Sequence, residues 1–240
     1  MNLADIYRRT VKSRDIFFNR FVARPLAVPV VALLARTRVT PNQVTLASLA
    51  VFVLAAAGLV ALPGHGGLLA AVAVLTFSYV LDCADGMLAR LTGRSSPFGS
   101  FLDFTFDEMK AYLLVAACGT RLALYDPRGT LWLYVALWGL AGVAAGIGLT
   151  TFTRRPEYSG QAVRYDGEHD AAPPPKGLVQ RLVRLAESLA RWLVHYPSYI
   201  IYIAIADRLD GFLAVYSAVM WLYFGRTLRS VAKKAGGFNR

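Results

Sequence analysis

Cysteine is scarce in this sequence, and its scarcity excludes two kinds of site. The chain of 240 residues contains two cysteines, Cys83 and Cys118, and both lie within apolar stretches. Two such residues cannot form the disulfide framework of a small secreted domain, and their separation does not match a zinc-binding spacing. We expect Cys83 to pack between helices rather than bind a ligand. Of the histidines, His65 is expected to be a solvated loop residue and His195 a packing residue.

Charged residues are also few, and acidic residues are fewer than basic ones. Charged residues make up 17% of the chain and hydrophobic residues 56%, with the apolar residues in long blocks. This composition is typical of a protein that crosses a membrane several times. The 26 Lys and Arg outnumber the 15 Asp and Glu, which gives a net charge of +11. Such an excess can indicate nucleic-acid binding. Here the basic residues flank apolar stretches, so they indicate orientation in the membrane and contact with anionic lipid.

The apolar stretches predict the fold class, which is an all-α integral membrane protein with six transmembrane helices. A spanning helix needs about 20 predominantly apolar residues, with shorter and longer examples known. The six expected spans cover about Val44–Leu62, Leu68–Arg90, Phe98–Leu122, Leu131–Phe152, Trp192–Ala206 and Phe212–Phe224. They form one domain, residues 39–240, which includes a polar cytoplasmic loop at 153–176.

The segment before this domain, residues 1–38, differs in character. It carries eight basic residues, and its apolar side chains fall near one helical face. This pattern predicts an amphipathic helix on the cytoplasmic surface of the membrane. The apolar run Pro25–Ala35 has eleven residues and is too short to span. We expect no signal peptide, because no short apolar region directly follows a charged start.

The distribution of basic residues predicts the orientation. With both termini in the cytoplasm, 22 basic residues lie on the inner side, and three (Arg121, Arg128 and Arg208) lie on the outer side. Positive charge gathers on the cytoplasmic side of membrane proteins. We therefore expect the protein in the cytoplasmic (inner) membrane, with both termini inside.

Four aspartates interrupt the second and third expected spans: Asp82, Asp85, Asp103 and Asp107. One aspartate at the centre of a spanning helix costs about 2.5–3.5 kcal/mol on insertion scales. The first two are three residues apart and the last two are four apart, so each pair shares a helix face. A turn signal at Gly93–Pro97 separates the pairs. Folding the two helices as a hairpin brings all four carboxylates together at the cytoplasmic edge of the membrane.

Carboxylates in this number suit Mg²⁺, Mn²⁺ or Ca²⁺, and two ions about 3.5–4 Å apart can be bridged by them. Gly86 and Arg90 lie beside the cluster, four residues apart. A glycine lets a ligand approach the backbone, and an arginine offers a planar fork to phosphate oxygens. The stretch therefore predicts a site for a metal ion and a phosphate.

The spacing of these residues resembles the signature of the CDP-alcohol phosphotransferases (CDP-alcohol phosphatidyltransferases). That pattern, Asp-x2-Asp-Gly-x2-Ala-Arg-x8-Gly-x3-Asp-x3-Asp, is matched at each fixed position. The matching residues are Asp82, Asp85, Gly86, Ala89, Arg90, Gly99, Asp103 and Asp107. The resemblance covers about residues 40–155.

The resemblance implies an activity as well as a fold. It implies a six-span bundle, usually a homodimer, that holds two Mg²⁺ or Mn²⁺ ions on the four aspartates. It implies transfer of a substituted phosphate from a CDP-alcohol to an acceptor hydroxyl, with release of CMP, in phospholipid biosynthesis. Asp107 would be the general base. The nucleotide contacts carried over from the family are Asn42, Thr45, Gly86, Arg90 and Ser96.

Alternatives remain for the two substrates and for the roles of five further residues. The expected donor is CDP-diacylglycerol, although a soluble CDP-alcohol with a lipid acceptor is an alternative. Arg154, Arg155 and Arg226 end expected spans on the cytoplasmic side. They either bind a phosphorylated acceptor such as inositol phosphate or glycerol phosphate, or only anchor the helices. Lys110 either pairs with Asp107 or serves packing, and Glu108 has no assigned role.

Two other classes of protein carry related features. A membrane transporter with an acidic cation site also has carboxylates in its spans, but these should be spread over the membrane depth and over several helices. A catalytically silent scaffold should have lost a motif aspartate, and all four are present. A further acidic group lies in the polar loop: Asp166, Glu168, His169 and Asp170. Because a proline run follows it, we expect a mobile loop there rather than a metal site.

Overall fold

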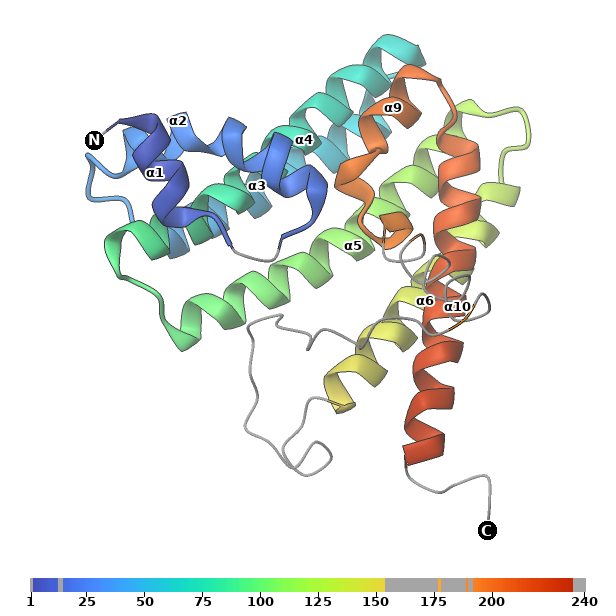
Figure 1. The fold of residues 1–240 in the computed structure, drawn as a ribbon. Helices are drawn as coiled ribbons and strands as arrows, with labels where there is room; N and C mark the ends of the chain where they lie inside the picture. The colour runs from blue at the N-terminus through green and yellow to red at the C-terminus, as the bar shows by residue number, and fades with distance from the viewer. Residues whose placement is uncertain (1, 13–14, 154–176, 178–188, 190–191, 235–240) are drawn as a thin grey trace. The chain divides into compact units, whose positions relative to one another are not determined.

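The computed structural model describes residues 2–12, 15–153, 177, 189 and 192–234, and no strand occurs among them. The protein is thus helical in its described part (Figure 1). The helices are α1 (Leu3–Thr10), α2 (Arg24–Leu34), α3 (Pro41–Ala61), α4 (Gly64–Thr92), α5 (Pro97–Tyr125), α6 (Leu131–Thr153), α9 (Ile200–Ile205) and α10 (Leu209–Lys234). A π-helical turn, η1 (Asn19–Ala23), precedes α2, and a 3₁₀ turn, η2 (Tyr196–Ser198), precedes α9.

Three of these helices, α3, α4 and α6, are long and apolar enough to cross a membrane. They agree with the first, second and fourth expected spans to within a few residues. The third expected span is the helix α5, which carries Asp103 and Asp107 of the motif. The prediction of a helical membrane protein is thus supported by three candidate spans.

The fifth expected span is not one helix. The chain leaves the helical conformation at His195, forms η2, and becomes helical again at Ile200. Pro197 lies in this interruption and cannot donate a backbone hydrogen bond to a continuous helix. The Tyr199 hydroxyl donates to the carbonyl of Leu193 across the break. A continuous span over Trp192–Ala206 was therefore wrong.

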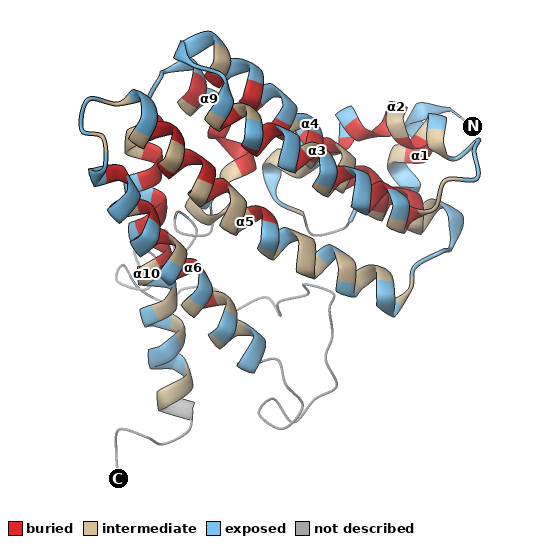
Figure 2. Cartoon of the chain, turned by 180° about the vertical axis from the view of Figure 1, so that it is seen from behind, coloured by how far each residue is buried: buried red, intermediate tan, exposed pale blue. Residues whose placement is uncertain are grey.

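The chain divides into two compact units, one of Met1–Ala117 with Ala204–Asp207 and one of Cys118–Ile203 with Arg208–Arg240. The division falls within α5. In the first unit, α4 packs against α3 and against α1 and α2. Figure 2 shows the buried residues of α3 and α4 where these helices meet, with exposed residues on their outer faces. Several outer residues are large and apolar: Leu46, Leu54, Leu69 and Phe77. Such faces suit contact with lipid.

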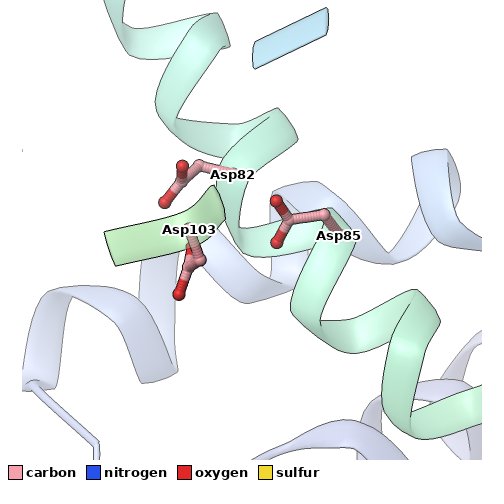
Figure 3. A group of neighbouring side chains, drawn as sticks. All are labelled: Asp82, Asp85 and Asp103. Atoms are coloured by element: carbon pink, nitrogen blue, oxygen red, sulfur yellow. The ribbon is translucent and has the colours of Figure 1, made fainter. Parts of the chain in front are cut away.

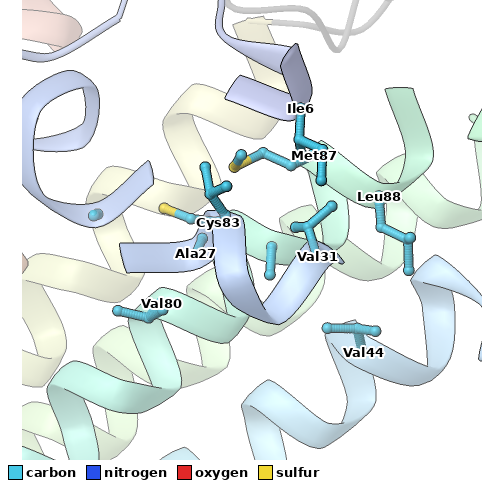
Figure 4. Packing of buried hydrophobic residues seen from close by; sticks show 11 residues of the cluster. Ile6, Ala27, Val31, Val44, Val80, Cys83, Met87 and Leu88 are labelled. Carbon is cyan, nitrogen blue, oxygen red and sulfur yellow. The ribbon is translucent and has the colours of Figure 1, made fainter. Parts of the chain in front are cut away.

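The N-terminal segment belongs to the first unit and is not one helix. It forms α1, η1 and α2, and it packs on α4 through a buried apolar cluster (Figure 4). The cluster consists of Ile6, Ala23, Ala27, Val28, Val31, Val44, Val80, Cys83, Ala84, Met87 and Leu88. The packing role expected for Cys83 is confirmed, since it is a buried member of this cluster.

Local sequence signals set the start of α3 and the end of α4. Thr40 caps α3: its hydroxyl accepts from the amide of Gln43, and the Gln43 side chain accepts from the amide of Thr40. Pro41 occupies the first helical position. The helix α4 ends at Gly93, which has a φ of 66°, a conformation that favours glycine. A short turn then leads to Pro97 and α5.

In the second unit, α6 and α10 pack closely through glycines. A Cβ atom on Gly142 would lie 3.1 Å from the Trp221 ring, and one on Gly146 would lie 3.5 Å from the Tyr223 ring. Trp221 also donates from Nε1 to the carbonyl of Trp138 at 2.9 Å. The Gly142–Gly146 step thus makes a contact within the chain.

Arg128 organises the loop between α5 and α6. It bonds Asp126 at 3.0 Å and Asp210 at 3.0 Å, and its guanidinium lies 4.5 Å from the centre of the Trp132 ring. The hydrogen bonds from Arg128 lower the pKa of Asp126. In the first unit, His65 holds another loop, because its Nε2 lies 2.8 Å from the carbonyl oxygen of Ala204. His65 is exposed, as expected for a solvated residue, but it lies in the first turn of α4 rather than in a loop.

Candidate active site

Three of the four motif aspartates lie together. Asp82 and Asp85 project from α4 and Asp103 from α5, and Figure 3 shows their carboxyl groups turned toward one another. One carboxylate oxygen from each lies within 4.8 Å of the others. The helical spacing of Asp82 and Asp85 places both on one face of α4, and the turn after Gly93 brings α5 back alongside. We call this group the aspartate cluster.

Asp85 is the most buried member of the aspartate cluster, with 5% of its surface exposed. Its Oδ2 atom has no hydrogen-bond partner among the described residues. Thr45, on α3, lies beside the same carboxyl group, and its hydroxyl donates to the carbonyl of Pro41 at 3.1 Å. A buried carboxylate oxygen without a partner is costly unless a cation binds it. The residues present therefore fit a divalent cation, which prefers several carboxylate oxygens.

Asp82 accepts a hydrogen bond from α3 that the sequence did not reveal. Ser48, fully buried on α3, donates to Asp82 Oδ1 at 3.3 Å. Ser78 in turn donates to the backbone carbonyl of Ser48 at 2.8 Å. A signal was present, since Ser48 follows Thr45 by three residues and is polar within an apolar span. These bonds fix α3 against the face of α4 that carries the aspartate cluster.

Lys110 links the fourth aspartate to the others. Its ammonium group forms an ion pair with Asp82 and lies 3.6 Å from Asp107 Oδ1. The Lys110 side chain is 5% exposed and that of Asp107 is 57% exposed. Asp107 is not part of the three-carboxylate group but shares the ammonium group of Lys110 with Asp82. Of the two roles left open for Lys110, the structure supports pairing with Asp107 and adds a pairing with Asp82.

Arg90 lies one turn beyond Gly86 on α4 and its side chain covers that glycine. A Cβ on Gly86 would lie 3.3 Å from Arg90 Nη1. Arg90 Nε donates to the backbone carbonyl of Thr10 at 2.8 Å, whereas the buried Nη2 has no partner among the described residues. The glycine therefore leaves room for the arginine side chain. Thr10 was not predicted, because nothing in its sequence context indicates this contact.

Two of the remaining nucleotide candidates meet at the start of α5. Ser96 accepts from the amide of Gly99 at 3.0 Å, which caps the helix. The Asn42 Oδ1 atom would lie 2.9 Å from a Cβ on Gly99. The absence of a side chain at Gly99 thus lets the first turn of α3 approach the first turn of α5. Asn42 and Ser96 are brought together there, while Thr45 lies deeper, beside Asp85.

The candidates for acceptor binding are less well placed by the structure. Arg226 is exposed on α10, in the second unit. Arg154 and Arg155 lie outside the described residues, as do the acidic loop residues Asp166, Glu168, His169 and Asp170. Glu108 is partly buried on α5, and its position assigns it no role.

Comparison with known proteins decides the family. The family model for CDP-alcohol phosphatidyltransferase matches residues 38–166, which is more than half of the chain. The chain belongs to the CDP-alcohol phosphatidyltransferase family. The match contains the aspartate cluster, Asp107 and Lys110, and it begins just before α3. The resemblance found in the motif is therefore confirmed over the whole length of four helices, α3 to α6.

Named relatives narrow the comparison. A protein of Aeropyrum pernix named archaetidylinositol phosphate synthase is 41% identical over 97 residues, which cover 38% of this chain and 47% of that protein. The chain thus matches about half the length of this relative. A protein of Corynebacterium glutamicum named phosphatidylinositol phosphate synthase is 33% identical over 170 residues, covering 70% of this chain and 68% of that protein.

A solved structure supports the fold. The chain is similar to the Mycobacterium tuberculosis phosphatidylinositol phosphate synthase, whose crystal structure has CDP-DAG bound. The TM-score is 0.54 and the sequence identity is 20%, with 89% of this chain and 97% of that chain covered. This likeness extends beyond the family match and includes both units of the fold.

Proposed function

We propose that this protein transfers a phosphatidyl group from CDP-diacylglycerol to the hydroxyl group of inositol phosphate and releases CMP, as a step in phospholipid biosynthesis. The observation that carries the proposal is the aspartate cluster, with its buried and unpartnered Asp85 oxygen, in the motif of this family. The names of the relatives favour inositol phosphate over glycerol phosphate as the acceptor.

The aspartate cluster would hold divalent cations, with Asp107 as the fourth ligand. We propose Mg²⁺ or Mn²⁺, in two sites, because four carboxylates offer more oxygens than one small cation uses. When bound, such ions neutralise a diphosphate and stabilise the charge that develops on a leaving phosphate. The side-chain bond from Ser48 holds Asp82 in place before any ion binds, and Thr45 lies beside Asp85.

The nucleotide would lie along α4 and the first turn of α3. Arg90 directs its unpartnered Nη2 atom to the diphosphate, and Gly86 lets the ligand approach the helix. Asn42, Thr45 and Ser96 contribute polar atoms from α3 and from the start of α5. A bidentate arginine recognises phosphate more specifically than a point charge does, which favours this role for Arg90.

Asp107 is the proposed general base. The acceptor hydroxyl oxygen attacks the phosphorus atom that carries the diacylglycerol group, and its proton passes to the Asp107 carboxylate. The bond between this phosphorus and the bridging oxygen breaks, and CMP leaves with the bridging oxygen. The high exposure of the Asp107 side chain suits a group that meets an incoming substrate. Lys110 orients Asp107 through its contact at 3.6 Å.

The acceptor would be bound through its phosphate by Arg154, Arg155 and Arg226. The support for this assignment is their charge and their expected place at the cytoplasmic ends of spans. For the whole molecule we propose six spans with both termini in the cytoplasm, residues 1–38 at the membrane surface and residues 39–240 as the catalytic domain. The active site would face the cytoplasm from the inner membrane, and the protein would be a homodimer.

The test is CMP release by the purified protein with Mg²⁺ or Mn²⁺, CDP-diacylglycerol and a panel of acceptors. We expect release with inositol phosphate and loss of release after chelation. Release with glycerol phosphate alone would correct the acceptor. Binding of CDP without release would favour a soluble CDP-alcohol donor with a lipid acceptor. A protein that neither binds CDP nor releases CMP would overturn the proposal and favour a transporter with an acidic cation site.

A further inference from the structure

The segment that precedes the family match is docked next to the motif. Residues 38–166 match the family model, so α1 lies outside the matched region. Ile6 on α1 is 2% exposed and packs in the same buried cluster as Met87 and Leu88 of α4 (Figure 4). Met87 and Leu88 lie in the helical turn that directly precedes Arg90. The position of α1 on α4 is therefore fixed one turn from the motif arginine.

The last residue of α1 holds Arg90 directly. Thr10 is fully buried, and its hydroxyl donates to the carbonyl of Ile6 at 2.7 Å. Its own backbone carbonyl accepts from Arg90 Nε at 2.8 Å. Because α1 ends at Thr10, this carbonyl is not used within the helix and is free to bind the guanidinium. The end of one helix thus provides the acceptor for the side chain of another.

The three nitrogens of the Arg90 guanidinium are in different surroundings. Nε is bound to Thr10, Nη1 lies over Gly86, and Nη2 is buried without a partner among the described residues. An arginine side chain loses considerable rotamer freedom when it is held in one position. The hydrogen bond to the Thr10 carbonyl offsets this loss of side-chain entropy before a ligand arrives. It leaves Nη2 available to the ligand. Such preorganisation strengthens binding.

Other bonds keep the N-terminal segment in place independently of α1. Asp15 and Arg24 form a buried ion pair, with side chains 7% and 6% exposed. Asn19 donates to Asp15 and accepts from the hydroxyl of Tyr79 on α4. Tyr7 on α1 donates to the carbonyl of Arg20 at 2.6 Å. The segment is therefore tied to α4 through Asn19 as well as through α1, and the Tyr7 bond couples α1 to Arg20.

We propose that Thr10 is a positioning residue for nucleotide binding: its backbone carbonyl, held by the docking of α1 on α4, orients Arg90 toward the diphosphate of the CDP-alcohol. This inference rests on the function proposed above. It makes the N-terminal segment part of the nucleotide site, in addition to any role at the membrane surface.

The first test loosens α1 without touching Arg90. Ile6→Ala removes the buried contact with α4, and Leu3→Ala on the exposed face of α1 is the matched control. The full-length protein is titrated with CDP by calorimetry, and KM and kcat are measured for CDP-diacylglycerol. For Ile6→Ala we expect CDP binding to weaken and KM to rise about five- to tenfold, the equivalent of one typical hydrogen bond, with kcat unchanged within about twofold. Leu3→Ala should match the wild type.

The second test asks whether α1 acts through Arg90. Ile6→Ala is combined with Arg90→Ala, and the CDP dissociation constants form a double-mutant cycle. If Thr10 positions Arg90, Ile6→Ala adds no further loss once Arg90 is absent. Equal losses in the two backgrounds would show that α1 only stabilises the fold, and they would overturn the inference. No loss from Ile6→Ala in the wild-type background would overturn it as well.

A milder variant covers the case in which Ile6→Ala does not fold. Thr10→Val keeps the volume of the side chain and removes its bond to Ile6, so it should weaken CDP binding about two- to threefold, again only when Arg90 is present. Wild-type CDP binding and CMP release, measured in the same preparations, separate the two proposals. A wild type that binds CDP while Thr10→Val and Ile6→Ala bind it equally well overturns the positioning role alone. A wild type that binds no CDP overturns both.

Discussion

Three of the four motif aspartates lie in different environments, and each environment suits a different role. Asp85 is buried, has an oxygen without a partner among the described residues, and is the proposed cation ligand. Asp82 forms an ion pair with Lys110 and accepts a hydrogen bond from Ser48. Asp107 is exposed and bound on one side only, which is where a proton acceptor must meet substrate. Sequence spacing alone treats these residues as equivalent.

The role of Asp107 can be tested by a change of one atom. Asp107→Asn removes the proton acceptor and keeps the size of the side chain. We expect CMP release to fall at least about 100-fold, since general-base catalysis contributes about 10²–10⁴. CDP binding should stay within about threefold of wild type, because the three carboxylates of the aspartate cluster remain and the amide oxygen of the variant side chain can still bind a cation. Asp126→Asn, in the loop after α5, is the control and should leave turnover unchanged. Turnover by Asp107→Asn near the wild-type rate would contradict the assignment.

Lys110 neutralises charge that would otherwise repel within the site. Replacing it by Met leaves Asp82 and Asp107 without their cationic partner, and an unpaired buried charge is strongly destabilising. We expect Lys110→Met to lower the unfolding temperature by about 5 °C or more when divalent ions are chelated. Added Mg²⁺ should restore more stability to this variant than to the wild type, because binding to the folded state stabilises it.

The measurement for Lys110 is thermal unfolding in detergent with and without Mg²⁺. Lys110→Arg keeps the positive charge and should behave much more like wild type than Lys110→Met does. An unfolding temperature of Lys110→Met that equals the wild-type value in chelator would show that the ion pairs carry no net stability.

At the residue level, the sequence predicted the contacts that follow from helical spacing. Asp82 and Asp85 share a face because they are three residues apart, and this needs no knowledge of the fold. Ser48 and Thr10 were missed because their contacts depend on how α3 and α1 are shifted along α4. No local pattern in the chain determines those shifts.

At the level of helices, the start of α3 is the most clearly encoded feature. Thr40→Ala removes the capping box, and loss of such a cap costs about 0.5–2 kcal/mol. Because Asn42 and Thr45 lie in the first two turns of α3, fraying there should also weaken CDP binding. We expect a lower unfolding temperature and a higher CDP dissociation constant. Thr40→Ser retains the hydroxyl and should restore both; failure of Ser to do so would assign the effect to packing.

Helix boundaries were predictable where Pro and Gly mark them, as at Pro41, Gly93 and Pro97. The interruption at Pro197 was missed, because the surrounding residues are apolar and the hydropathy pattern continues through it. The partner of the Gly142–Gly146 step was also open, since close helix contact can be made within a chain or between chains. The structure places α10 there.

For the whole molecule, the orientation proposed from basic residues can be tested by chemical labelling. Both native cysteines are buried and should react little with a membrane-impermeant maleimide. We expect Thr130→Cys, in the exposed loop before α6, to react in intact cells. Arg94→Cys, in the turn between α4 and α5, should react only after the membrane is opened. The reverse labelling would show that the active site faces outward.

The pairing of Lys110 with Asp82 also bears on how the chain enters the membrane. The two residues lie on different helices, α4 and α5. Each charge adds to the free-energy cost of moving its own helix into lipid, whereas the pair is close to neutral. The helix α4 should therefore remain beside the insertion machinery until α5 has been synthesised, and the two should enter as one hairpin. We therefore expect Lys110 to couple the insertion of α4 to that of α5.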